Sequence, residues 1–194
     1  MIEFLIILAV VLVLYVIWKY WTLPIGAGYD PTPMDKVYKM LDLAEVNKDD
    51  ILYDLGSGDG RIIITAAKRF GAKAVGIEAD PFRFLLSWLL ILLSGQSKRI
   101  KLKFGNFFKK KINKATVVTV FLYGPTNNKL KEKFQKELKS GTRIVSYVWT
   151  FDNWELENAL PEDRIYLYVM KQGNLRQLKR QFKAIEGRRG HEKA

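Results

Sequence analysis

Residues 51–61, ILYDLGSGDGR, decide the fold of this 194-residue chain. An apolar run ends in three glycines at alternate positions, and a segment with helical character, Ile62 to Phe70, follows them directly. Glycines permit positive φ and lack the Cβ atoms that would keep a ligand away from the backbone. The helix that follows offers free N–H groups and the positive end of its dipole. The order of strand, glycine-rich turn and helix therefore predicts a site for a nucleotide-like ligand.

The spacing of these glycines narrows the class of ligand. A dinucleotide fingerprint needs its third glycine at position 61, and a phosphate-binding P-loop also needs a glycine there, but that position is Arg61. Asp54 and Asp59 make the turn acidic, which disfavours a pyrophosphate and favours a cationic ligand. S-adenosylmethionine carries a sulfonium, an ammonium and no phosphate, so it suits this turn. The alternative is a glycine-rich turn that binds no ligand.

The composition excludes several classes of protein. An apolar content of 48% and an aromatic content of 13% are too high for a disordered chain. The chain has no cysteine, which excludes a disulfide framework, a thiolate metal site and a catalytic thiol. Its single histidine, His191, lies in a polar tail, so we expect neither histidine-based catalysis nor a metal site. The net charge of +12 favours an acidic partner, such as anionic lipid, nucleic acid or an acidic protein surface.

The N-terminal segment has the character of a membrane anchor. Residues 4–18 carry no charge and lie between Glu3 and Lys19. A helix that crosses a bilayer needs roughly 20 apolar residues, so we predict an anchor over residues 1–21 and a Pro/Gly linker over residues 22–30. The positive-inside rule then predicts a single-pass membrane protein with its N-terminus outside and its basic domain on the cytoplasmic side. A helix buried in the core is the alternative.

The remainder of the chain alternates strand-like apolar runs with helical segments. This alternation predicts an α/β fold with a doubly wound, mostly parallel sheet, in which ligands bind at the carboxyl ends of the strands. We place this domain at residues 31–170 and a basic C-terminal tail at residues 171–194. Besides residues 51–55, the expected strands cover residues 73–78, 100–104, 115–121, 142–147 and 164–170.

Two further segments have more than one interpretation. The helix expected from Phe82 to Ser94 is apolar on almost every side, which is typical of a helix in a core, against a membrane or against a partner. The stretch from Lys98 to Lys114 is basic and contains no acid. It is either a solvated face or a surface that contacts anionic lipid.

The motifs also resemble those of a known family. Asp54–Gly60 resembles motif I of the class I, seven-strand S-adenosylmethionine-dependent methyltransferases. Combined with Tyr29-x-Pro31-Thr32-Pro33, Gly105-Asn-Phe-Phe108 and Thr126-Asn127, it is similar to the small archaeal protein-lysine methyltransferases and their membrane-anchored mitochondrial relatives. The resemblance covers residues 29–170. It implies a Rossmann-like fold with a sheet of seven strands and S-adenosylmethionine as the cofactor.

The same resemblance implies roles for individual residues. Glu78 ends its expected strand at the position where nucleotide folds place a carboxylate on the ribose hydroxyls, and Asn106 and Phe107 would hold the adenine. The cofactor-binding residues implied in this way are Thr32, Asp54, Gly56, Ser57, Gly58, Gly60, Glu78, Asn106 and Phe107. Tyr29 and Tyr123 would position the reactants in catalysis, without a dedicated base. The substrate-binding residues would be Tyr29, Pro31, Thr126, Asn127, Tyr147 and Trp149.

The resemblance, together with the predicted anchor, implies an enzyme that N-methylates lysine side chains of a membrane-proximal protein. A lysine with its ordinary pKa of about 10.4 must lose its proton before it attacks a methyl group, and an aromatic, poorly hydrated channel lowers that pKa. One alternative keeps the fold and changes the acceptor: the basic stretches favour RNA, and the anchor favours a lipid-soluble small molecule. A membrane-tethered binding module without activity is the other alternative. We prefer a protein to a nucleic acid as the partner.

Overall fold

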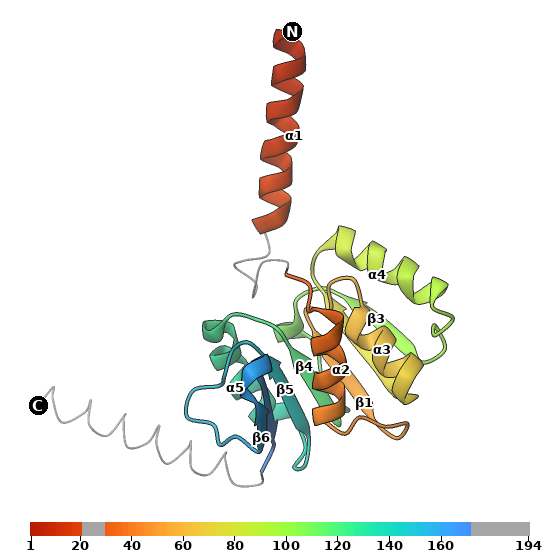
Figure 1. Ribbon diagram of the computed structural model, residues 1–194, viewed down its shortest axis with the longest axis vertical. Coiled ribbons are helices and arrows are strands. Elements are labelled where there is room, and N and C mark those ends of the chain that lie inside the picture. The colour runs from red at the N-terminus through yellow and green to blue at the C-terminus, as the bar shows by residue number, and fades with distance from the viewer. Residues whose placement is uncertain (21–29, 172–194) are drawn as a thin grey trace, which may run out of the picture.

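The computed structural model describes residues 1–20 and 30–171 and contains one seven-stranded sheet with the strand order β3-β2-β1-β4-β5-β7-β6 (Figure 1). Strands β1 to β5 run parallel, whereas β7 pairs antiparallel with both β5 and β6. The strands are β1 (Ile51–Leu55), β2 (Lys73–Glu78), β3 (Ile100–Phe104), β4 (Val117–Val120), β5 (Arg143–Tyr147), β6 (Asn158–Leu160) and β7 (Ile165–Val169). The predicted α/β class and the mostly parallel sheet are therefore confirmed.

Helices cover both faces of this sheet. Alternate residues of β1 point to opposite sides, so Leu52 packs with the apolar faces of α2 and α3 while Tyr53 packs with that of α5. Figure 1 shows α2 and α3 in front of the sheet. The helices are α1 (Ile2–Tyr20), α2 (Met34–Leu43), α3 (Arg61–Phe70), α4 (Pro81–Leu93) and α5 (Gly124–Glu137), with short 3-10 helices η1 (Phe107–Lys109) and η2 (Pro161–Asp163).

Three local differences from the sequence-based expectation have physical causes. The charged segment from Lys129 to Lys139 predicts a helix, but α5 already begins at Gly124, because Pro125 in its first turn has a φ that suits a helix start. Consequently Thr126 and Asn127 lie in the first turn of a helix and not in a loop. Strand β6 was not expected, since it is only three residues long and pairs solely at the sheet edge.

The N-terminal segment forms the predicted helix, α1, and its described large apolar side chains are 45–72% exposed. The alternative of a helix buried in the core is therefore wrong. Over residues 1–20 and 30–171, however, no helix is long and apolar enough to cross a membrane, so the predicted transmembrane span is not supported in this part of the chain. The predicted linker except Asp30, and the predicted tail except Lys171, lie outside the described residues.

Helix α4 has its polar residues inside and its apolar residues outside. Arg83, Ser87 and Ile91 form the stripe that faces the domain and is buried. Seven large apolar side chains of the same helix are 44–74% exposed: Phe82, Leu85, Leu86, Trp88, Leu89, Leu92 and Leu93. Among the interpretations of this segment, a helix of the core is therefore wrong.

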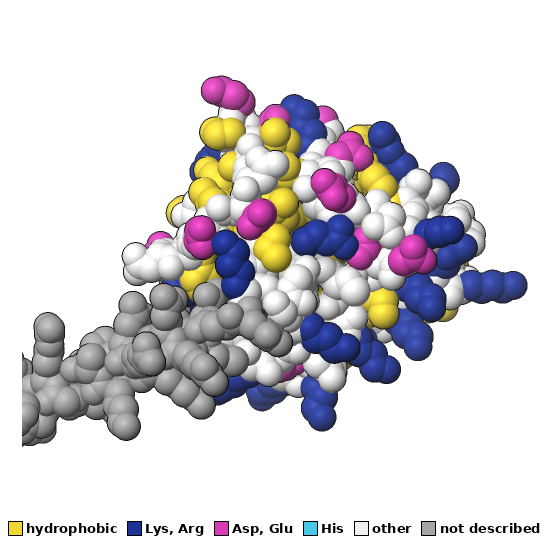
Figure 2. All heavy atoms as spheres, turned by 90° about the horizontal axis from the view of Figure 1, so that it is seen from below, with side chains coloured by type: hydrophobic (Ala, Val, Ile, Leu, Met, Phe, Trp, Pro, Cys, Tyr) yellow, Lys and Arg dark blue, Asp and Glu magenta, His cyan; other side chains and the backbone are white. Residues whose placement is uncertain are grey.

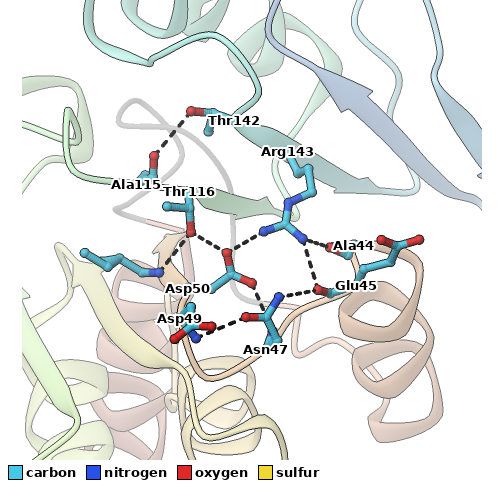
Figure 3. Close-up of polar contacts among 10 residues, drawn as sticks. Ala44, Glu45, Asn47, Asp49, Asp50, Ala115, Thr116, Thr142 and Arg143 are labelled. Atoms are coloured by element: carbon cyan, nitrogen blue, oxygen red, sulfur yellow. Dashed lines mark hydrogen bonds and ion pairs between the residues drawn. The ribbon is translucent and has the colours of Figure 1, made fainter.

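A polar network joins several elements at the amino ends of the parallel strands (Figure 3). Arg143 at the start of β5 forms an ion pair with buried Asp50 and donates to the carbonyl oxygens of Ala44 and Glu45 after α2. The Thr116 hydroxyl donates to Asp50 Oδ1 at 2.6 Å. The network ties α2 to β1, β4 and β5 on the side of the sheet away from the carboxyl ends of the strands.

Candidate active site

The glycine-rich turn between β1 and α3 is held against β2 by backbone hydrogen bonds. The N–H groups of Gly56 and Ser57 donate to the Ile77 carbonyl oxygen at 2.9 and 3.0 Å. The Gly58 N–H donates to Glu78 Oε2 at 2.7 Å. Gly56, Gly58 and Gly60 all have positive φ, at 84°, 55° and 85°, a region that other residues enter only at a cost. The turn therefore needs its three glycines, and it lies at the carboxyl ends of β1 and β2.

Two buried carboxyl groups lie beneath this turn. Asp54 is 3% exposed and Glu78 is 5% exposed. The Thr119 hydroxyl on β4 donates to Asp54 Oδ1 at 2.8 Å. The pKa of Asp54 is raised to about 7, mainly because the carboxyl is buried. The hydrogen bond from Thr119 lowers this pKa, whereas the negative charges of Glu78 and Asp59 raise it. A cation placed here would gain from both carboxylates and would favour their ionised form.

Glu78 also organises the start of α4. Its Oε1 accepts from the N–H groups of Ala79 and Asp80 at 3.0 and 2.8 Å. Burial raises the pKa of Glu78, although these backbone bonds, the bond from Gly58 and the positive charge of Arg83 lower it. Asp80 Oδ1 in turn accepts from the Arg83 N–H at 2.9 Å, which makes Asp80 the N-cap of α4.

Close packing fixes the turn from behind. A Cβ on Gly60 would overlap the Ser87 hydroxyl of α4, and a Cβ on Gly76 would lie 2.7 Å from both Ser57 Oγ and Ile63 Cδ1. The hydroxyl groups of Ser57 and Ser87 are buried, and neither has a hydrogen-bond partner among the described residues. Gly76 was not expected from the sequence as a residue of the site. Its position in the middle of β2 is the signal that could have revealed it, because a strand glycine often marks a close approach.

An arginine clamps the segment before α2 onto the turn. Arg61 pairs with Asp59 through Nη2 at 2.6 Å, and its Nη1 donates to the Thr32 carbonyl oxygen at 2.8 Å. This bond places Thr32 beside the glycine-rich turn. Thr32 is buried there, whereas Pro31 is exposed. In the sequence, Arg61 served only to exclude the motifs that need a glycine at this position. Its contacts with Asp59 and Thr32 give it a structural role. Tyr29, predicted to close over the cofactor and the substrate, lies outside the described residues.

Aromatic side chains gather at the carboxyl ends of β4 and β5. Phe121 and Tyr147 meet edge to face with ring centroids 4.6 Å apart. Tyr123 and Trp149 meet similarly at 6.4 Å. Leu122 lies beside them and within 3.3 Å of a Cβ placed on Gly56, so this aromatic group borders the glycine-rich turn. The structure thus brings together the predicted Tyr123, Tyr147 and Trp149.

Asn127 holds the turn that carries Trp149. Its Nδ2 donates to Ser146 Oγ at 3.1 Å and to the Trp149 carbonyl oxygen at 3.2 Å, and the Ser146 hydroxyl donates to that same carbonyl. Val148 between these residues has a φ of 69°, which is strained for a β-branched side chain. Such strain persists where the surroundings enforce it, and it is concentrated at functional sites. Thr126, predicted beside Asn127 as a substrate contact, is buried in the same turn of α5.

The segment predicted to hold adenine follows β3. Asn106 Oδ1 accepts from the Phe108 N–H at 2.8 Å and caps η1. Phe107 is buried in the core and contacts Phe108 with ring centroids 4.8 Å apart. The Gly105 N–H donates to the Glu78 carbonyl oxygen at 2.7 Å, which places Asn106 next to Glu78. The roles of Asn106 and Phe107 in ligand binding stay predictions.

Comparisons with known proteins agree with this geometry. Residues 54–158 match the family model described as the ANTKMT methyltransferase domain. A protein-lysine N-methyltransferase of Saccharolobus islandicus is 46% identical over 73% of this chain and 92% of its own. The adenine nucleotide translocase lysine N-methyltransferase of Mus musculus is 31% identical over 60% of this chain, which spans 52% of that relative. An RNA methyltransferase from Salinibacter ruber, crystallised with S-adenosyl-L-homocysteine, is 37% identical with a TM-score of 0.72, over 74% of this chain and 95% of that one.

Proposed function

Because the chain belongs to the ANTKMT methyltransferase domain family of S-adenosylmethionine-dependent enzymes, we propose that it N-methylates lysine side chains of a protein close to a membrane. The lysine acceptor is supported by the Saccharolobus islandicus and Mus musculus relatives, whose names specify lysine. The position of that acceptor near a membrane is supported by the apolar α1 helix.

The residues of the turn suit S-adenosylmethionine, which supplies an electrophilic methyl group on a positively charged sulfur. The observation that carries the proposal is the pair of buried carboxyls, Asp54 and Glu78, whose pKa values are raised within the described structure. Such an unfavourable concentration of negative charge is relieved by a cationic ligand. We expect Asp54, Glu78 and the backbone of Gly56 and Gly58 to hold the cofactor, with Asn106 at its adenine end.

The aromatic group after β4 and β5 suits the acceptor. Tyr123, Tyr147 and Trp149 offer ring faces that attract an ammonium group. Tyr123 and Trp149 are 45% and 40% exposed, so an acceptor that binds against them would displace water. Poor hydration lowers the pKa of a lysine, so the neutral amine needed for attack becomes accessible. We assign no side chain as the base, and the proton leaves to water. Asn127 and Ser146 hold the Trp149 turn in place and thereby orient the acceptor.

The placement of the enzyme is also a proposal. We expect α1 to attach the domain to a membrane, with the domain on the cytoplasmic side, because the described apolar side chains of this helix are exposed and such exposure is unfavourable in water. If α1 only contacts the surface electrostatically, high salt will release the full-length protein from membranes. We expect that release requires detergent instead.

RNA is the second candidate acceptor, and a specific finding favours it. The related structure from Salinibacter ruber is named an RNA methyltransferase, and the segment from Pro81 to Lys131 contains no acidic residue. Figure 2 shows lysine and arginine side chains over much of the rim of the domain. A basic surface binds the phosphates of RNA without regard to sequence.

One fractionation experiment separates these acceptors. Full-length protein is incubated with S-adenosylmethionine carrying a radiolabelled methyl group, together with cell membranes and total RNA. Label in a protein band supports lysine methylation, label in nucleic acid supports the RNA alternative, and label in the lipid extract supports a lipid-soluble acceptor. Asp54→Ala should abolish the label, whereas the exposed Asp42→Ala should retain it. If the Asp54→Ala protein still transfers label, the proposed cofactor site is wrong.

A further inference from the structure

Helix α4 lacks an explanation in the chemistry of the active site. Its buried stripe of Arg83, Ser87 and Ile91 faces the glycine-rich turn, while its outer face carries seven large apolar side chains that are at least 44% exposed. Phe104 on the neighbouring strand β3 is 50% exposed and meets Phe84 edge to face, so it extends the same apolar surface. Contiguous exposed apolar surface of this kind marks a contact with a protein or a membrane.

The charges around this face favour a membrane. β3 is the edge strand of the sheet and contacts α4 through Phe104 and Phe84, and the exposed Lys98 and Arg99 lie just before it. Because no acid occurs between Pro81 and Lys131, nothing within that segment opposes a negatively charged surface. An apolar helix face bordered by basic side chains is typical of helices that lie in the interface of an anionic bilayer.

The path of the chain also favours contact between α4 and a membrane. Thr32 is tied to the glycine-rich turn by Arg61, and Gly60 of that turn packs directly on Ser87 of α4. The described chain therefore enters the domain beside α4, at the end of the domain from which α1 extends in Figure 1. Residues 21–29 span at most about 30 Å. A membrane that holds α1 consequently lies within reach of α4.

We propose that the outer face of α4, with Phe104, docks onto the surface of an anionic lipid bilayer and orients the active site towards it. This inference rests on the proposed attachment of α1 to a membrane. A helix is about 10 Å across, so the glycine-rich turn on the inner side of α4 would sit close to the bilayer surface. Docking would then select lysines that lie near the membrane surface over lysines on soluble proteins.

Single cysteines test the proposal cleanly, since the natural chain contains none. Leu89→Cys and Leu85→Cys report on the outer face of α4, the exposed Lys129→Cys on α5 is the matched control, and Val10→Cys reports on α1. Each full-length variant is labelled with nitrobenzoxadiazole and reconstituted into vesicles of phosphatidylcholine with phosphatidylserine. Two quenchers are compared: iodide in the water, and doxyl groups on the lipid chains. Only variants that still bind S-adenosylhomocysteine are used, which ensures that the domain is folded.

We expect both α4 labels to be quenched by doxyl lipid and to be about threefold less accessible to iodide than the Lys129 label. Replacing Lys98 and Arg99 together with glutamine should reduce this shielding. Equal iodide accessibility at Leu89 and Lys129 would overturn the docking, and doxyl quenching at Val10 would show that the α1 attachment nevertheless holds. Shielding from iodide without doxyl quenching would also overturn it, because a second copy or another segment would then cover α4. Loss of doxyl quenching at Val10 alone would instead refute the attachment of α1.

Discussion

Replacing Asp54 with asparagine should strengthen folding at pH 7 and above and remove cofactor binding in the same variant. The folded state raises the pKa of this buried carboxyl from 3.8 to about 7. It therefore holds its proton more tightly than the unfolded chain does. Because the folded state then binds more protons, stability is lost as the pH rises from about 4 to about 7. Asparagine has the same shape, still accepts from Thr119 and does not ionise.

The magnitude follows from the pKa difference. A difference of this size corresponds to about 4 kcal/mol of destabilisation once the carboxyl is fully ionised. The new amide NH₂ group lacks the partners of a carboxylate, which costs about 1–3 kcal/mol and does not depend on pH. We therefore expect the difference in unfolding free energy between Asp54→Asn and the wild type to shift in favour of the variant by about 2–3 kcal/mol between pH 5 and pH 8.

Cofactor binding should also depend on the ionisation of Asp54. The affinity should rise as this carboxyl ionises, whereas the stability of the fold should fall. A cationic ligand prefers the carboxylate, and with a pKa of about 7 roughly a tenth of Asp54 is ionised at pH 6. We expect the affinity of the wild type for S-adenosylmethionine to fall about tenfold from pH 8 to pH 6. The assays are urea unfolding of the full-length protein in detergent, followed by circular dichroism, and titration calorimetry. A stability difference that stays constant from pH 5 to pH 8, with an equal affinity at both ends, would refute the reasoning.

Three further substitutions test other parts of the structure. Gly60→Ala should lower the unfolding free energy by about 2 kcal/mol, because position 60 has a positive φ and the new Cβ overlaps α4. Gly95→Ala is the control: Gly95 has a φ of 72° and no atom within 4 Å of an added Cβ. Its loss of stability in the same urea assay therefore measures the cost of the positive φ alone. Arg143→Ala should cost about 3 kcal/mol by leaving the buried Asp50 carboxylate without its ion pair, and it should leave the affinity for S-adenosylmethionine unchanged in calorimetry. Trp149→Ala should raise the KM for a lysine substrate about tenfold without changing that affinity, which steady-state kinetics would show.

The sequence predicted the fold and the position of the glycine-rich turn well, because these depend on local signals. Glycines at positive φ, an acid at the end of β2 and an aspartate before α4 leave a pattern in consecutive residues. The structure places Asp54, Gly58 and Glu78 together as those patterns predicted. Their contacts with S-adenosylmethionine remain predictions.

Features that depend on tertiary packing were less accessible. The Arg61 clamp joins residues that are far apart in sequence, and Thr119 supports Asp54 from another strand. Helix α4 shows the limit most clearly. Its composition gave no sign of which side faces the domain, because the buried stripe contains Arg83 and Ser87, residues that hydropathy places outside. The packing of Gly60 against Ser87 and of Ile91 in the core explains that orientation.

The most direct test of the enzyme's activity is to identify the atom that receives the methyl group. Membranes are incubated with the full-length protein and S-adenosylmethionine carrying a deuterated methyl group, and the proteins and RNA are then digested and examined by mass spectrometry. Our account predicts deuterated methyl groups on lysine side chains of membrane proteins with the wild type, and none with Asp54→Asn. Deuterated methyl groups on RNA nucleotides alone, or on lysines equally with the Asp54→Asn variant, would contradict it.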